Sequence, residues 1–453
     1  MLQRFIRWLV RLIADTFFRR IEVIGLENVP ANGPVIFAGN HPNALMDGWL
    51  LTARCGRWPL HFLASAGLWK YRALAPLLDA SGAIPVTRRE DAAGEVDNRQ
   101  AFDRVYLALE SGQCVGIFPE GVSHVESQLV KLKTGTARIA LQLAARGKAR
   151  ASIVPCGLNY IHRHRFRSQV LIEFGPPIEV DDDWLRRYRE DEQQAVVDLT
   201  ETLAAAIRDV TLNAPDWRTL HFIQTVRRLY KPTIAELSPA QYVELSRRFL
   251  QTYLVDREDP EVQALAAAIE DYQGRLDLYG LKDYQLRREV SSGYAMRKIL
   301  LRTVTMLVLL PLALPGALLH LPIGWIAAVV GSRFSYEMDD VATLKVLSSA
   351  LLLPVLYVGV SIVVGLSFGF GWGMATASFL PFSFFASLRI LETEAGLLNS
   401  LLAFVRLVRL GKVVDDLRAM RSDLVQRVRD RVERRVDPAL ERIFTPDDFS
   451  AAP

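Results

Sequence analysis

Cysteine is scarce in this sequence of 453 residues, and no charge of one sign dominates it. The three cysteines, Cys55, Cys114 and Cys156, lie far apart and lack the paired spacing of a zinc site or a disulfide framework. The formal net charge is only +4 and is spread along the chain, so the composition does not favour nucleic acid as a partner. Internal repeats and low-complexity tracts are also missing. These absences favour a protein of a reducing compartment with no metal site.

Two long runs have no charged side chain, at residues 303–331 and 346–388. Each run exceeds the roughly 20 apolar residues that cross the hydrocarbon core of a bilayer. Because 50% of all residues are hydrophobic, more than a soluble domain needs, we expect both runs to face lipid. The second run is long enough for two crossings with a turn at residues 365–373. The prolines of the first run leave either one kinked span or a re-entrant pair.

Basic residues flank this membrane region, and they are Arg297, Lys298, Arg302, Arg389, Arg406, Arg409 and Lys412. Positive charge marks the cytoplasmic ends of spans. The sequence therefore predicts an integral membrane protein with an even number of crossings, two to four, within residues 296–390. We expect the regions before and after it to lie on the cytoplasmic face.

The first 20 residues have the pattern of an amphipathic, cationic helix. Arg4, Arg7, Arg11 and Asp15 recur at helical spacing, with apolar residues on the other side. No signal-peptide cleavage site follows them. We expect a helix that lies in the membrane interface, and the alternative is a helix packed on a soluble core.

Between residues 34 and 175, short β-rich runs alternate with helical patterns, which predicts an α/β fold. The expected strands are Val35–Ala38, His61–Ala64, Ala83–Thr87, Cys114–Phe118, Ser152–Cys156 and Val170–Phe174. Helices are expected at Asp97–Glu110 and Thr134–Ala145, and Arg146 and Gly147 end the second. We assign residues 21–180 to this domain.

Two further regions contain no chemical motif. Residues 181–295 are charged, mostly helical and interrupted by prolines, which predicts a helical accessory region. Residues 391–453 form a charged cytoplasmic tail, in which 401–436 reads as a helix rich in arginine and aspartate. We expect one of three positions for that helix: along the anionic inner leaflet, paired with another helix, or exposed to solvent.

The stretch NHPNALMD places His41 directly after an apolar strand and Asp47 six positions later. A carboxylate that accepts a hydrogen bond from one imidazole nitrogen leaves the other free as a base. Six residues on a regular helix turn through about 600°, so the two side chains meet only if His41 precedes the first regular turn. Taken alone, such a pair is more often structural than catalytic.

Two further stretches offer polar groups for a substrate. GAIPVTRR delivers Arg88 and Arg89 at a strand end, where a guanidinium can clamp a phosphate. FPEGVSH ends a buried strand in a turn that points Glu120 into the cleft at that sheet edge.

Beyond this turn, Lys133 and Arg138 at a helix start offer another anion site, although Arg138 reads equally well as a surface residue. The fourth stretch, IVPCG, is a strand whose Pro155 belongs at an edge or a strand end.

In this order, the four stretches resemble the boxes of the glycerolipid acyltransferase superfamily across roughly residues 20–180. The resemblance implies a mixed, mainly parallel sheet flanked by helices. It also implies that His41 is the general base and Asp47 its orienter, and that Pro155 shapes the cleft. Acyl-acceptor binding would then fall to Arg88, Glu120 and Gly121. The acyl donor would be acyl-CoA or acyl carrier protein, with no further cofactor.

Two features depart from the common pattern of that superfamily. Five residues, rather than four, separate His41 from Asp47, and Val122 and Ser123 stand where many members have threonine and arginine. The longer first box is similar to that of fungal-type glycerol-3-phosphate and dihydroxyacetone-phosphate acyltransferases, which also have membrane segments downstream. This favours acylation at sn-1 in phospholipid synthesis.

Two rival functions stay open at this point. In the first, the acceptor is a lysophospholipid such as lysophosphatidic acid. In the second, the chain is a non-catalytic lipid carrier or membrane scaffold. A serine hydrolase using Ser123 beside His124 is disfavoured, because adjacent residues of an extended chain point to opposite sides.

Overall fold

The computed structural model describes residues 2–70, 72, 75–87, 97–232, 236–286, 292–335, 338–435 and 443–444. The chain divides into two compact units. The first comprises Met1–Trp217, Ser238–Glu244 and Phe334–Val346, and the second comprises Arg218–Leu237, Leu245–Arg333 and Leu347–Pro453.

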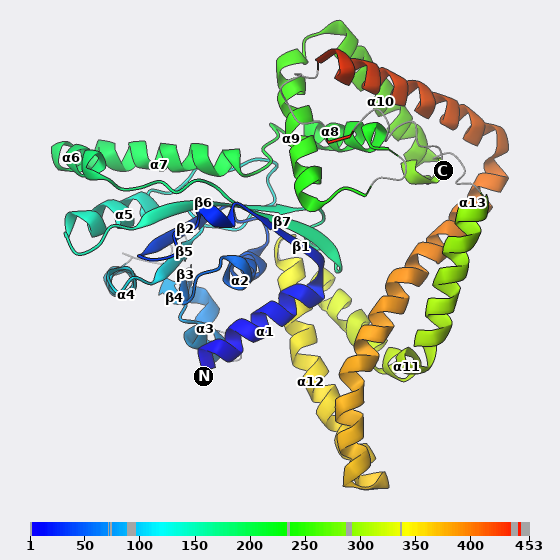
Figure 1. Ribbon diagram of the computed structural model, residues 1–453, viewed down its shortest axis with the longest axis horizontal. Helices are drawn as coiled ribbons and strands as arrows, with labels where there is room; N and C mark the ends of the chain where they lie inside the picture. Colours follow the sequence, from blue (N-terminus) through cyan, green and yellow to red (C-terminus); the bar gives the residue numbers. More distant parts are fainter. Residues whose placement is uncertain are drawn as a thin grey trace. The chain divides into compact units, whose positions relative to one another are not determined.

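A seven-stranded sheet with the order β1-β7-β6-β2-β5-β3-β4 forms the centre of the first unit (Figure 1). Its strands are β1 (Phe18–Ile24), β2 (Val35–Gly39), β3 (Leu60–Ser65), β4 (Ile84–Val86), β5 (Cys114–Ile117), β6 (Ser152–Tyr160) and β7 (Ser168–Phe174). All neighbouring pairs are parallel except β6 and β7. The predicted α/β fold with a mixed, mainly parallel sheet is therefore confirmed.

Helices cover both faces of this sheet. They are α1 (Leu2–Phe17), α2 (Ala44–Arg54), α3 (Ala75–Ser81), α4 (Arg99–Glu110), α5 (Gly135–Ala145), α6 (Asp182–Glu190) and α7 (Glu192–Asp209), with short 3₁₀ helices at Leu26–Asn28 and Ala66–Lys70. One buried apolar cluster joins α4, α5 and α7 to the sheet, and another joins α1 and α2 to its opposite face. Because β2 and β5 are buried on both faces, they read in the sequence as continuous apolar runs.

The parallel strands bring two of the predicted stretches to one edge of the sheet. Strand β2 pairs with both β5 and β6, so the chain leaves all three at the same end. His41 follows β2 and Glu120 follows β5, while Tyr160 is the last residue of β6. The carboxyl ends of these strands therefore define the position of the candidate site.

The position predicted for Pro155, at an edge or a strand end, is wrong. Pro155 lies inside β6, which is a central strand between β7 and β2, opposite Ala38. Its carbonyl accepts a hydrogen bond from the Gly175 amide at 2.9 Å, so the backbone of Pro155 points away from β2. The ladder with β7 begins only at Cys156, and the missing N–H therefore breaks no ladder hydrogen bond.

The N-terminal helix α1 ends at Phe17, and the residues that follow it form strand β1. Its side chains Ile6, Val10 and Ala14 are buried in the core beneath the sheet, as in the alternative that the sequence left open. Phe5 and Trp8 are exposed by 55% and 56%. One side of α1 is therefore a core face, and contact of the other side with a membrane stays a prediction.

Helices α6 and α7 extend the first unit beyond residue 180. Asp181 and Asp191 cap them by accepting hydrogen bonds from the amides of Trp184 and Gln194. Leu199, Leu203 and Ile207 of α7 are fully buried in the same cluster as α5. The sheet domain therefore runs on to Trp217.

The second unit is helical. It contains α8 (Trp217–Tyr230), α9 (Pro239–Asp256), α10 (Pro260–Leu278), a 3₁₀ helix (Asp283–Gln285), α11 (Ser292–Arg333), α12 (Asp340–Phe368) and α13 (Phe370–Arg435), although the ends of some belong to the first unit. A buried apolar cluster joins α8 and α10 to the last part of α13. Of the three fates left open for the 401–436 helix, the structure shows the pairing with another helix.

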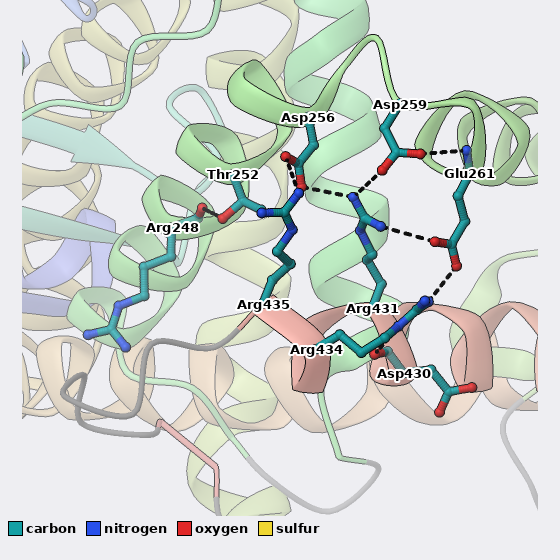
Figure 2. Close-up of polar contacts among 9 residues, drawn as sticks. All are labelled: Arg248, Thr252, Asp256, Asp259, Glu261, Asp430, Arg431, Arg434 and Arg435. Carbon is teal, nitrogen blue, oxygen red and sulfur yellow. Dashed lines mark hydrogen bonds and ion pairs between the residues drawn. The ribbon is translucent and has the colours of Figure 1, made fainter.

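Ion pairs join the end of α13 to the end of α9 and the start of α10 (Figure 2). Arg431 reaches Asp256 at 2.9 Å, Asp259 at 2.6 Å and Glu261 at 3.0 Å. Arg435 reaches Asp256 at 2.9 Å. Because Asp256 is largely buried, this network is held more firmly than an isolated surface pair.

Two helical segments, Val304–Arg333 and Asp340–Phe368, are long and apolar enough to cross a membrane. Their large apolar side chains are exposed, as for Leu351 at 66% and Leu366 at 84%, which suits contact with lipid. Gly369, with φ of +102°, turns the chain between α12 and α13, inside the predicted turn. These features indicate a membrane protein.

Helix α11 is a single bent helix in Figure 1, with Pro311, Pro315 and Pro322 inside it. Side-chain hydrogen bonds join the middle of this helix to α13. Ser383 and Ser387 of α13 donate hydrogen bonds to the carbonyls of Leu312 at 2.5 Å and Ala313 at 2.9 Å.

Residues before α11 and residues after the apolar part of α13 share one buried apolar cluster.

Candidate active site

His41 and Asp47 meet, because the chain turns sharply between them. Nδ1 of His41 lies 2.8 Å from Oδ2 of Asp47. Helix α2 begins only at Ala44, so His41 precedes the first regular turn, and Ala44 adopts the left-handed φ of +42°. This unusual residue absorbs the longer spacing of the first stretch. The contact that the chemistry requires is therefore present.

Asp47 is fully buried and accepts hydrogen bonds on both oxygens. Oδ2 accepts from the Asn43 amide at 2.7 Å as well as from His41, and Oδ1 accepts from the Tyr160 hydroxyl. Burial raises the pKa of Asp47, although the hydrogen bonds from His41, Tyr160 and Asn43 oppose that rise. The three donors stabilise the carboxylate in a place where a bare charge would be costly.

The ring of His41 is fixed in a second way. It stacks on Phe118 with a centroid distance of 4.1 Å and an interplanar angle of 5°. Because a carboxylate only accepts, Nδ1 carries the proton and Nε2 has a free lone pair. In the part of the chain that the structure describes, Nε2 has no hydrogen-bond partner, and the side chain stays 18% exposed. The free nitrogen is available to a substrate.

Glu120 holds the main chain of His41. Its Oε2 accepts from the His41 amide at 2.9 Å and lies 2.7 Å from Nε2 of His124. The His124 amide in turn donates to the His41 carbonyl at 3.1 Å. Burial lowers the pKa of His124, but the hydrogen bond and charge of Glu120 outweigh it, and the net shift is upward. Glu120 Oε1 is buried and has no partner among the described residues.

Gly121 brings Lys133 against this turn. Its φ is +81°, and a Cβ built on it would lie 2.8 Å from Lys133 Cδ and 2.9 Å from Lys133 Nζ. The Lys133 amide also donates to the Pro119 carbonyl at 2.7 Å. The ammonium group therefore crosses directly over the Glu120–Gly121 turn.

The other predicted site residues are less close to this group. Arg88 lies outside the described residues. Arg138 is an exposed residue of α5, with no recorded contact to His41, Asp47 or Glu120. Pro155 is buried inside β6 and packs near Gly175.

Two family models match parts of this chain. A family model described as Acyltransferase matches residues 20–159, and one described as Glycerol-3-phosphate acyltransferase 2 C-terminal domain matches residues 222–440. Both parts of the chain are therefore similar to glycerolipid acyltransferases.

Two relatives within the superfamily come from Saccharomyces cerevisiae. Glycerol-3-phosphate O-acyltransferase 2 is 32% identical over 73% of this chain and 49% of its own length. Glycerol-3-phosphate O-acyltransferase 1 is 33% identical over 60% of this chain and 38% of its own length. The chain thus spans about half the length, or less, of these curated relatives.

Among solved structures, the 1-acyl-sn-glycerophosphate acyltransferase PlsC from Thermotoga maritima matches 44% of this chain and 80% of its own length. Its TM-score is 0.31 and its sequence identity is 17%.

Four residues of this site were not predicted from the sequence: Asn43, His124, Tyr160 and Arg163. Tyr160 was missed because the expected strand stopped at Cys156, whereas β6 continues for four more residues to the edge where β2 ends. A strand extended through the run GLNY would have found it. His124 was considered only as a partner of Ser123, and Asn43 and Arg163 carry no local signal.

Proposed function

We propose that this chain transfers a fatty acyl group from an acyl thioester to a hydroxyl of glycerol-3-phosphate or dihydroxyacetone phosphate. The observation that carries the proposal is the 2.8 Å contact of His41 with buried Asp47, which leaves Nε2 free. The names of the two yeast relatives, both glycerol-3-phosphate O-acyltransferases, support glycerol-3-phosphate as the acceptor.

In the proposed reaction, Nε2 of neutral His41 takes the proton of the acceptor hydroxyl as its oxygen attacks the thioester carbonyl. The ionised Asp47 stabilises the imidazolium that forms. The new C–O bond then expels the thiolate as the C–S bond breaks, and the imidazolium returns its proton to the sulfur. No enzyme nucleophile and no further cofactor are needed, because the thioester already carries the activated acyl group.

Three groups of the site suit a phosphorylated acceptor. The buried Oε1 of Glu120 can accept a hydrogen bond from an acceptor hydroxyl. Lys133 offers a cation over the adjoining turn, and we assign Arg88 to the same anion on the resemblance of its stretch. Positioning by such groups must supply most of the rate beyond the roughly 100- to 10,000-fold of a general base.

We also infer how the chain lies at the membrane. The segments before and after the apolar helices share one core, which supports an even number of crossings. Basic residues flank these helices, which supports cytoplasmic flanks, and we place the catalytic unit on the same face. The donor would then be acyl-CoA or acyl carrier protein from that compartment, and membrane lipids would surround α11 to α13.

The decisive experiment supplies purified protein in nanodiscs with labelled acyl-CoA or acyl carrier protein and a panel of acceptors. Glycerol-3-phosphate or dihydroxyacetone phosphate should be acylated, and His41→Ala should lose the activity. His164→Ala is the matched control, because this side chain is exposed in the same unit and only its carbonyl has a recorded partner, Lys345.

Two outcomes would overturn the proposal. Preference for lysophosphatidic acid would assign the site to lysophospholipid acylation instead. Equal transfer by His41→Ala and the unaltered protein would show that His41 is not the general base. No transfer to any acceptor would favour a lipid carrier or scaffold.

A further inference from the structure

Arg163 lies beside the candidate base, although it is distant in sequence. It belongs to the loop between β6 and β7, three residues after Tyr160. Its Nη1 is 3.3 Å from the His124 carbonyl and 3.5 Å from the carbonyl of Pro42, the residue that follows His41. The guanidinium thus contacts the main chain of both stretches that form the site.

Two contacts hold Arg163 in this place. The fully buried Asn43 donates from Nδ2 to the Arg163 carbonyl at 3.0 Å, which fixes the loop to the start of α2. The guanidinium carbon also lies 5.7 Å from the centre of the Trp217 ring, within the range of a cation–π contact. A guanidinium that is already ordered loses less entropy when it binds a ligand.

The guanidinium forms no direct ion pair within the described part of the chain, although the charges of Asp47 and Asp339 act on it from farther away. No carboxylate there lies within ion-pair distance of it, and its recorded polar partners are two main-chain carbonyls at Nη1. Burial lowers the pKa of Arg163, and the charges of Asp47 and Asp339 oppose that shift. Both Asp47 oxygens already accept other hydrogen bonds, and Asp339 is not within ion-pair distance of the guanidinium. A half-buried cation of this kind calls for an anionic ligand.

The residues that directly precede His124 in the sequence carry no charge. The third stretch places Val122 and Ser123, both uncharged, immediately before it. Lys133 lies over the Glu120–Gly121 turn and so approaches from another stretch of chain. Nε and Nη2 of Arg163 have no recorded partner among the described residues, and this fork has the geometry that binds two oxygens of a phosphate.

We propose that Arg163 binds the phosphate of the acyl acceptor and so makes the site selective for phosphorylated alcohols. The inference rests on the proposed function and adds to it the residue that selects the acceptor. The contact with Pro42 places the bound anion next to His41, as a three-carbon acceptor requires for its free hydroxyl to reach the base.

The test compares Arg163→Met and Arg165→Gln in full-length protein in nanodiscs. Arg165 lies in the same loop, is exposed, and its side chain has no recorded contact. Loss of a charge-assisted pair should raise KM for glycerol-3-phosphate about 10- to 100-fold in Arg163→Met. The same variant should keep kcat within about threefold, because a contact made equally in ground and transition states affects KM alone. Arg165→Gln should match the unaltered protein.

Two further measurements separate binding from folding. Inorganic phosphate should compete with glycerol-3-phosphate in the unaltered protein and in Arg165→Gln, and about tenfold more weakly in Arg163→Met. If Arg163→Met fails to fold, Arg163→Lys carries the test, since it keeps the charge but loses the fork and should raise KM several-fold.

An unchanged KM and unchanged phosphate competition in a folded Arg163 variant would overturn the inference while the proposed function stands. If the unaltered protein acylates none of the phosphorylated acceptors, the proposed function itself fails.

Discussion

The phenol of Tyr160 donates a hydrogen bond to Oδ1 of Asp47, the oxygen that does not face His41. Tyr160 ends β6 and Asp47 lies in the first turn of α2, so this bond ties the sheet to the helix that orients the base. Burial raises the pKa of Tyr160 well above its usual value, and the phenol therefore stays protonated and can only donate to the carboxylate. Tyr160 is thus a positioning residue, which acts on His41 through Asp47.

We expect Tyr160→Phe to lower kcat/KM about tenfold, because one charge-assisted hydrogen bond to Asp47 is lost. The acid limb of the pH profile should also move to higher pH. The Tyr160 hydrogen bond lowers the pKa of Asp47, so without it the carboxylate ionises only at a higher pH. Kinetics from pH 5 to 9 measure both effects.

Tyr106→Phe is the control for this change. Tyr106 donates to Gln142 on the other side of the sheet, so its removal should leave the acid limb in place. Superimposable acid limbs for Tyr160→Phe and the unaltered protein would show that Tyr160 only packs.

Asp47→Asn should abolish transfer without loss of stability. The folded pKa of Asp47 is raised above the unfolded value of about 3.9, so the unfolded chain ionises first as the pH rises. The free energy of unfolding therefore falls with rising pH from about 3.9 up to the folded pKa of Asp47. Asparagine does not ionise, so the variant avoids this loss of stability. Its amide can still accept from Asn43 and His41 and donate to Tyr160.

The expected result is a melting temperature equal to or above that of the unaltered protein, with a difference that grows as the pH rises from about 4 to the folded pKa of Asp47 and is constant above it. Turnover should drop by about 100- to 10,000-fold. Asp103→Asn, at an exposed position on α4, should change neither quantity. A clear fall in the melting temperature of Asp47→Asn would mean that the carboxylate stabilises the fold.

The sheet and the order of the site stretches could be predicted from sequence, because buried strands read as apolar runs that end in polar residues. The expected strands that lead to His41 and Glu120 match β2 and β5 to within one residue. Strand β1 was not predicted, since its residues follow an amphipathic helix without a break and continue the same basic pattern.

The detailed site could not be predicted, since it depends on contacts between distant residues. The meeting of His41 with Asp47 depends on the left-handed backbone of Ala44, a residue type that gives no sign of it. Tyr160 reaches Asp47 across 113 positions, and Arg163 reaches Pro42 across 121. Such pairings follow from the order of the strands in the sheet, which local sequence patterns do not reveal.

In the second unit, Arg431→Gln should detach the end of α13 from α10. Arg431 joins Asp256, Asp259 and Glu261, and its loss leaves the largely buried Asp256 with Arg435 alone among the recorded ion pairs (Figure 2). We expect a melting temperature several degrees lower, measured by circular dichroism in detergent. Arg427→Gln removes an exposed pair with Asp423 on the same helix and should shift it by about one degree at most. Equal shifts for both variants would contradict a specific role of the network.

Gly121→Ala tests whether the position of Lys133 matters for acceptor binding. Gly121 has a left-handed φ of +81°, so alanine should destabilise the protein by about 1 kcal/mol through backbone strain. In addition, the new Cβ would lie 2.8 Å from the stem of Lys133 and must push this side chain off the turn. Gly112→Ala is the matched control, because Gly112 has a similar φ of +72° with nothing within 4 Å of its Cβ position. Urea unfolding should show a similar loss of stability for both variants, whereas KM for glycerol-3-phosphate should rise only in Gly121→Ala. Since the backbone strain is common to both variants, a difference in KM between them reports the displacement of Lys133. Equal KM values would show that Lys133 does not contribute to acceptor binding.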